Sequence, residues 1–266
     1  MIEQYEQTVL NFLGPQAIED AKKHALAQFP KESCGFIAGG TYVACENLNA
    51  KPLEEFTITD PRYDAAVINK TLQAVIHSHP HGTLIPSQTD MAQQIATNVP
   101  WGVITLNEKG IHKMIAWGGN LPIAPLIGRP FIHGVFDCYS CVRDVFRLGK
   151  DELAKENITW PLPPIALPEV ARGDMWWEQG DDLYMDHLLK VGFKQIGMGE
   201  AKPGDGFLVA LGDSRVNPKK RINHAGVLLG HDQILHHIPT RLCSRMPAGP
   251  WANSAQMWVR YGGPTS

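Results

Sequence analysis

The stretch Val75-Ile-His77-Ser-His79-Pro-His-Gly-Thr-Leu-Ile-Pro-Ser87-Gln-Thr-Asp90 decides how the first half of this chain is interpreted. The apolar residues before the histidines predict a buried strand. Side chains alternate along a strand, so His77 and His79 point the same way. Ser87 has the pattern of a helix N-cap, which places Asp90 in the first helical turn, facing back towards the imidazoles. Two imidazoles and one carboxylate leave a fourth position open, as in catalytic zinc sites.

A simpler explanation of these histidines is chance. The chain holds 11 histidines, so some fall together without any function. His81 is one such extra histidine, and Pro80 and Gly82 on either side of it have the composition of an ordinary loop. On local chemistry alone, a metal site and a loop with two unrelated histidines both stay open.

The surroundings of the stretch resemble a known family of zinc peptidases. His-Ser-His-Pro followed by Ser-x-x-Asp is similar to the JAMM (JAB/MPN+) metallopeptidase motif, and Pro30-Lys-Glu32-Ser-Cys-Gly35 matches the context of a glutamate that this family requires. The resemblance implies three Zn²⁺ ligands, which are His77, His79 and Asp90. In the mechanism that follows from it, Glu32 takes a proton from water and Ser87 helps to hold the oxyanion.

Composition and charge exclude several classes of protein. With 44% hydrophobic and 19% charged residues, the 266-residue chain is globular and long enough for two small domains. A net charge of −3 without a long Lys/Arg run argues against nucleic acid as a partner. No apolar run approaches the roughly 20 residues of a membrane span, and the acidic start argues against a signal peptide. Five cysteines at irregular spacing predict free thiols.

The first half is predicted to be a small α/β domain. We expect residues 1–14 to be an extended lead-in, followed by a helix at 15–29. The further expected elements are strands at 34–38, 41–48, 101–106 and 111–117 and helices at 60–69 and 87–97, around the histidine strand. This order predicts one mixed sheet with flanking helices, the cytidine-deaminase-like fold of the JAMM family. We expect domains at residues 1–118 and 127–266, joined by a Gly- and Pro-rich linker at 119–126.

The second half carries a cysteine at the start of a predicted helix. Val142, Val145 and Phe146 have helical spacing, so Cys138 lies at the helix N-terminus, where the helix dipole is expected to lower the pKa of its thiol. Cys138 and Cys141 also form Cys-x-x-Cys, which leaves a redox pair or half of a structural zinc site as alternatives. No second Cys pair completes a four-thiolate set, and Cys141 fits a core position better.

The remaining elements surround two candidate histidine positions. Residues 157–180 are rich in Pro and Trp and predict a long surface loop, and whether it lines a groove stays open. We expect a helix at 182–191 and strands at 206–211, 223–229 and 234–239. His224 and the His236/His237 pair then lie on adjacent strands, and a cysteine at a helix N-terminus with such histidines is the papain-type arrangement. Read alone, His224 is equally well a buried core residue.

Several short motifs resemble the NlpC/P60 cysteine peptidases. They are Phe136-Asp-Cys138, Pro203-Gly-Asp205 and His224-x-Gly-Val-x-Leu-Gly230. The resemblance implies an α+β papain-like domain with Cys138 as nucleophile and His224 as base. In that family the third residue lies twelve after the base, which selects His236. The usual Asp-Cys-Ser-Gly-Leu is here Asp137-Cys-Tyr-Ser-Cys141, and the lost Ser-Gly pair bears on pocket shape and substrate.

A JAMM-like half followed by an NlpC/P60-like half resembles the tail tip assembly proteins of lambda-like siphophages. The resemblance implies a bifunctional hydrolase that acts in the host cytoplasm during assembly or in the virion tail tip. Its implied partners are tail tip proteins, the central tail fibre protein and the tape measure protein, with peptidoglycan stem peptides or a tail protein as substrate. The alternatives are a structural assembly factor with vestigial sites and an isopeptidase acting on ubiquitin-like proteins.

Overall fold

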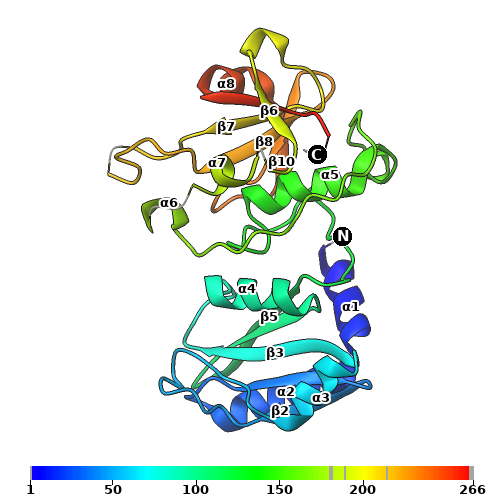
Figure 1. The fold of residues 1–266 in the computed structure, drawn as a ribbon, viewed down its shortest axis with the longest axis vertical. Coiled ribbons are helices and arrows are strands. Elements are labelled where there is room, and N and C mark those ends of the chain that lie inside the picture. Colours follow the sequence, from blue (N-terminus) through cyan, green and yellow to red (C-terminus); the bar gives the residue numbers. More distant parts are fainter. Residues whose placement is uncertain (1, 180–181, 189, 214, 264–266) are drawn as a thin grey trace. The chain divides into compact units, whose positions relative to one another are not determined.

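The chain forms two compact units, Met1–Pro122 and Ile123–Ser266. We describe each separately in a computed structural model that covers residues 2–179, 182–188, 190–213 and 215–263 (Figure 1). The first unit contains a mixed sheet and the second an antiparallel sheet, each with helices on its faces, so the chain has one α/β and one α+β domain, as the sequence predicts. Within the described ranges, no helix is both long and apolar enough to cross a membrane.

The first unit is a mixed five-stranded sheet covered by four helices. Its helices are α1 (Ile2–Leu13), α2 (Pro15–Gln28), α3 (Pro61–Ile68) and α4 (Gln88–Thr97). Its strands are β1 (Cys34–Ala38), β2 (Thr41–Cys45), β3 (Leu72–Pro80), β4 (Trp101–Asn107) and β5 (Gly110–Trp117). The strand order is β2-β1-β3-β4-β5, and β3 and β4 form its parallel pair.

Alternation along β3 assigns its two faces. Ala74 and Ile76 pack against α1 and α2, whereas His77 points to the opposite face, where α4 lies (Figure 1). The prediction of an extended lead-in at residues 1–14 is wrong, because α1 occupies residues 2–13. Val9 and Leu13 lie one helical turn apart and bury against α2 together with the partly buried Tyr5 and Leu10, and this packing stabilises the helix.

The second unit is an antiparallel six-stranded sheet in the order β10-β9-β8-β7-β11-β6. Its strands are β6 (Phe193–Ile196), β7 (Gly206–Val209), β8 (His224–Leu228), β9 (Gln233–His236), β10 (Ser244–Pro247) and β11 (Met257–Tyr261). Its helices are α5 (Cys138–Lys155), α6 (Trp176–Gln179), α7 (Leu183–Leu188), the 3₁₀ turn η1 (Met198–Glu200) and α8 (Ala248–Ser254). The strands β6, β10 and β11 and the helix α8 have no counterpart in the sequence-based expectation.

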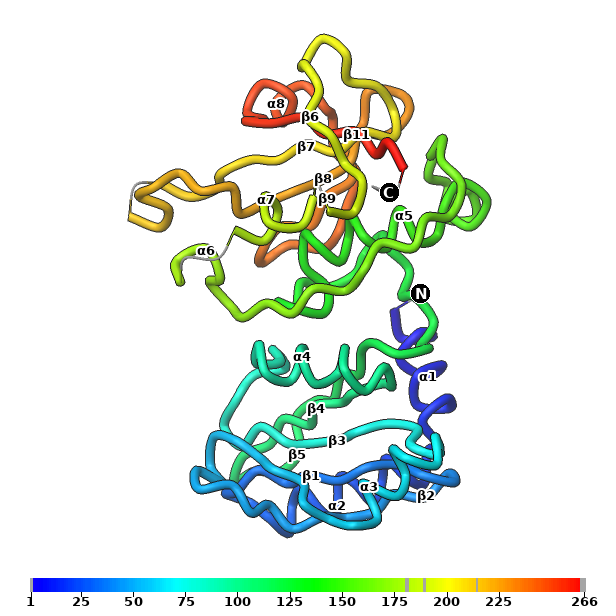
Figure 2. The backbone as a smooth tube through the Cα atoms, viewed as in Figure 1, coloured from blue at the N-terminus to red at the C-terminus, as the bar shows by residue number. Residues whose placement is uncertain are grey.

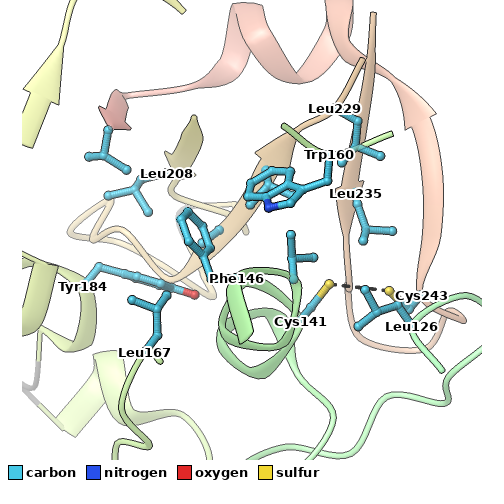
Figure 3. Packing of buried hydrophobic residues seen from close by; sticks show 14 of the residues in the cluster. Leu126, Cys141, Phe146, Trp160, Leu167, Tyr184, Leu208, Leu229, Leu235 and Cys243 are labelled. Atoms are coloured by element: carbon cyan, nitrogen blue, oxygen red, sulfur yellow. Dashed lines mark hydrogen bonds between the residues drawn. The ribbon is translucent and has the colours of Figure 1, made fainter. Parts of the chain in front are cut away.

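The core of the second unit lies between α5 and the sheet. Phe146 of α5 packs with Leu208 and Leu235 from the strands and with Trp160 from the segment after the helix (Figure 3). A second cluster, which includes Phe207 and the half-buried Trp251, forms where α8 covers the other face. Within its described residues 157–179, the Pro- and Trp-rich stretch contains α6 and is otherwise irregular. Trp160 and Trp176 are buried in this core and anchor the stretch to it.

Candidate functional site

His77, His79 and Asp90 converge at the end of β3. His77 Nε2 lies 3.1 Å from His79 Nε2 and 3.6 Å from Asp90 Oδ1, and His79 Nε2 lies 3.9 Å from Asp90 Oδ2. Ligand atoms about 2.0–2.1 Å from a tetrahedral zinc are separated by roughly 3.4 Å, so this set fits such an ion. Among the described residues, these three side chains form the group whose ligand atoms are close enough to hold a metal ion.

Neighbouring polar groups orient these three side chains. The backbone N–H and the hydroxyl of Ser87 both donate to Asp90 Oδ2 at 2.7 Å, and the Asp90 N–H donates back to the Ser87 oxygen, which makes the capping box of α4. His79 Nδ1 contacts the Thr83 carbonyl at 2.9 Å, which leaves Nε2 directed at the cluster. Burial would raise the pKa of Asp90, but His77 and the Ser87 hydrogen bonds hold it well below its usual range.

Glu32 lies beside this cluster, just before β1. Its Oε1 is 4.0 Å from His79 Nε2, and its side chain is buried. Burial raises the pKa of Glu32 to about 7, against the opposing effect of His77. Burial and the neighbouring His77 lower the pKa of His79 to about 4, so its ring is neutral at pH 7, as a metal ligand must be. The cluster therefore combines a neutral His79 and an ionised Asp90 with a buried carboxyl group, Glu32, whose pKa lies near neutral pH.

Cys138 is the first residue of α5, and Asp137 is the helix N-cap. The thiol contacts the Tyr184 hydroxyl at 3.2 Å and donates to the Asn223 carbonyl at 3.9 Å. The expectation that the helix dipole lowers the thiol pKa is wrong. Burial and the adjacent charge of Asp137 outweigh the dipole and raise the pKa of Cys138 to about 11.

His224 and His236 lie on neighbouring strands with their rings in contact. His224 Nε2 is 3.1 Å from His236 Nδ1, and His236 Nε2 is 3.2 Å from the Met246 sulfur. Burial and the adjacent His236 lower the pKa of His224 well below its usual value, so its ring is a neutral base. His237 instead lies against Phe131, and neither of its ring nitrogens has a hydrogen-bond partner within the described ranges.

The thiol and the histidine pair are close in space but not directly bonded. Within the described part of the second unit, no hydrogen bond joins Cys138 to His224. Cys138 instead bonds the carbonyl of Asn223, the residue immediately before His224.

One neighbour of the thiol, Tyr184, is not anticipated from the sequence. Tyr184 lies on α7, 46 residues from Cys138, and its position in an apolar helical pattern does not distinguish it from a core residue. Cys141 is a core position, as expected, with its sulfur 3.5 Å from that of Cys243 (Figure 3). Neither Cys138 nor Cys141 belongs to a metal-binding group in the described part of the chain.

Comparisons with known proteins agree with this two-part organisation. Residues 15–117 match the model of prokaryotic homologs of the JAB domain, and residues 113–259 match the NlpC/P60 family. A solved NlpC/P60 family protein from Bacillus cereus is similar at a TM-score of 0.29 and 9% identity, over 90% of this chain and 66% of that chain.

Two curated relatives carry the same name. Tail tip assembly protein K of Escherichia phage N15 is 34% identical over 92% of this chain and 94% of its own length. Tail tip assembly protein K of Escherichia phage lambda is 34% identical over 65% of this chain and 72% of its own length. The chain therefore belongs to the tail tip assembly protein K family, in which a JAB-like domain precedes an NlpC/P60 domain.

Proposed function

We propose that this protein acts in phage tail tip assembly and carries two hydrolytic centres, one in each unit. The observation that carries the proposal is the convergence, in each unit, of side chains with complementary roles. In the first unit these are a three-residue ligand set and a carboxyl group with a pKa near 7. In the second they are the Cys138 thiol, which bonds the backbone carbonyl of the residue before His224, and the neutral pair of His224 and His236.

In the first unit, His77, His79 and Asp90 would hold Zn²⁺. The bound ion would supply a Lewis acid that polarises a peptide or isopeptide carbonyl. Glu32 takes a proton from the attacking water and passes it to the leaving amine. Ser87 keeps Asp90 in place through the capping box. To assist an oxyanion, as we propose, its hydroxyl would turn away from Asp90 Oδ2, to which it donates its one proton.

In the second unit, Cys138 is the nucleophile. Its thiol is protonated at neutral pH, so it needs a base to attack. The Cys138 side chain would turn from Tyr184 towards His224, and His224 would accept the thiol proton as the bond between sulfur and the substrate carbonyl carbon forms. His224 then gives this proton to the leaving amine, and a water hydrolyses the thioester with His224 again as base. His236 fixes the His224 ring through Nε2 and leaves Nδ1 for the thiol.

The substrates and partners we propose follow from the family. The thiol centre cleaves peptidoglycan stem peptides or a tail protein. The protein acts with tail tip proteins, the central tail fibre protein and the tape measure protein, in the host cytoplasm during assembly or at the virion tail tip. Names of the two relatives refer only to tail tip assembly.

Digestion of purified murein by the full chain tests the thiol assignment. We expect wild type and His77→Ala to release the same muropeptides, read by mass, because His77 belongs to the other unit. We expect Cys138→Ala to release none, and His224→Ala to be at least about 100-fold slower, as for loss of a general base. Release of the same fragments by Cys138→Ala would remove the thiol centre from the proposal.

A further inference from the structure

The segment after α5 runs back along that helix. Residues 157–179, which we call the strap, follow α5 from its C-terminal half to its N-terminus (Figure 2). Hydrogen bonds attach the strap to successive turns: Lys150 N to Leu162 O at 2.8 Å, Ile165 N to Phe146 O at 2.8 Å, Arg147 Nε to Leu167 O at 2.8 Å and Tyr139 Oη to Pro168 O at 2.9 Å. The strap therefore arrives at the helix end that carries Cys138.

Arg172 is the strap residue that enters this helix end. Its side chain is 1% exposed. All five of its N–H donors have acceptors: Nε and Nη2 bond the two oxygens of Asp137 at 2.7 and 2.9 Å, Nη2 also bonds Gly134 O, and Nη1 bonds Val170 O and Glu169 Oε1. A buried arginine with every donor satisfied is held in one orientation.

This arginine touches the residues on both sides of Cys138. Asp137, before the thiol, receives the bidentate pair and also caps α5 by accepting from the Ser140 N–H at 2.9 Å. Tyr139, after the thiol, has its ring 4.8 Å from the Arg172 guanidinium carbon, a cation–π contact. Arg172 thus fixes the backbone position from which the Cys138 side chain projects.

Arg172 also changes the charge that the thiol experiences. After burial, the carboxylate of Asp137 is the largest influence that raises the pKa of Cys138, and Arg172 acts in the opposite direction. The other polar groups around the thiol are the Tyr184 hydroxyl and the Asn223 carbonyl, just before β8. His133 does not face the thiol in this way, but it contributes to lowering the pKa of Asp137.

We propose that Arg172 is a positioning residue for Cys138, and that the strap serves to deliver it between Asp137 and the aromatic ring of Tyr139. The inference rests on the proposed thiol chemistry of this unit. It assigns a role to the Pro- and Trp-rich stretch: the segment closes the helix end behind the nucleophile and neutralises the carboxylate next to it.

The test measures the rate of Cys138 alkylation by iodoacetamide in the full-length protein between pH 7 and 10, with the adduct located by peptide mass. Arg172→Gln removes the positive charge, so the thiol pKa should rise. The thiolate fraction at pH 8 then falls, and the alkylation rate should fall with it by about tenfold. Arg172→Lys keeps the charge but loses the bidentate pair with Asp137 and the stacking on Tyr139, so its alkylation rate should lie between those of wild type and Arg172→Gln. Asp137→Asn combined with Arg172→Gln removes both charges and should restore most of the rate.

The matched control is Arg147→Gln, which breaks another strap contact at the Leu167 carbonyl without touching either neighbour of Cys138. It should leave the alkylation profile unchanged. An unchanged or faster rate in Arg172→Gln, or no recovery in the double variant, would overturn the proposal. If Arg172→Gln does not fold by circular dichroism, Asp137→Asn alone decides: a faster rate supports the proposal and an unchanged rate overturns it. Alkylation needs no substrate, so failure here is distinct from failure of the proposed hydrolase activity.

Discussion

At the scale of single residues, the buried position of Glu32 makes the stability of the first unit depend on pH. Its carboxyl group is buried beside Asp90 and its pKa is raised to about 7, so the folded state favours the protonated form. A raised folded pKa contributes stability that is complete below the unfolded value of about 4.3 and is lost as pH rises through about 7. The contribution of Glu32 to the stability of the metal-free first unit should therefore be smaller at pH 8 than at pH 4.

Glu32→Gln removes that titration. We expect the metal-free variant to unfold at a higher temperature than wild type at pH 8 and at nearly the same temperature at pH 4, as read by calorimetry. Glu54→Gln, at an exposed carboxylate, is the control and should change neither value. Equal unfolding temperatures for Glu32→Gln and wild type at pH 8 would show that burial does not perturb this carboxyl group.

At the scale of elements, α5 depends on a glycine near its middle. Gly149 has φ +67°, and a Cβ there would lie 2.4 Å from the Pro164 nitrogen of the strap. Gly149→Ala adds left-handed strain and a clash with backbone, and should destabilise the second unit by about 2–4 kcal/mol in urea unfolding. Gly128→Ala is the matched control, since Gly128 has φ +84° but nothing within 4 Å, and should cost only about 1 kcal/mol. An equal loss of unfolding free energy in the two variants would mean that the strap shifts at Pro164 to accept the added methyl group.

Elements with strong local signals could be predicted, whereas those defined by distant packing could not. The capping box at Ser87 and Asp90 and the alternation through His77 are read directly from neighbouring residues, and both are present. The strand β10 has four residues including Pro247 and shows no periodic pattern, whereas α1 carries Ile2, Tyr5, Val9 and Leu13 at helical spacing, a local signal that the prediction of an extended lead-in overlooks.

The same distinction applies to the sites. Ligand spacing predicts which side chains meet in the first unit, because β3 and α4 are adjacent in sequence. The surroundings of Cys138 come from Tyr184 and Arg172, 46 and 34 residues further on, and no local pattern marks either. The error about the thiol pKa has this origin: a helix N-terminus is visible in sequence, but the burial that raises the thiol pKa most is not, and the charge of Asp137, which stands next to Cys138 in the sequence, acts in the same direction as burial.

At the scale of the whole molecule, the two units should respond separately to metal. At a free Zn²⁺ concentration about 100-fold above Kd, binding stabilises a fold by about 2.7 kcal/mol, which raises Tm on the order of 10 °C for a unit of this size. We expect zinc to raise the midpoint temperature of one calorimetric transition of the full chain and to leave that of the other transition unchanged. His77→Ala should abolish the shift, and His112→Ala, at an exposed histidine, should retain it. A zinc shift that survives His77→Ala would place the ion elsewhere.

The most direct test of the two-centre account is the intact mass of the full chain during turnover of a murein stem peptide under acid quench. The account predicts a transient acyl adduct, which peptide mapping locates on Cys138. This adduct should be absent from Cys138→Ala and should still form when zinc is chelated. Hydrolysis of the same peptide by wild type without an adduct on Cys138, or undiminished hydrolysis by Cys138→Ala, would contradict it.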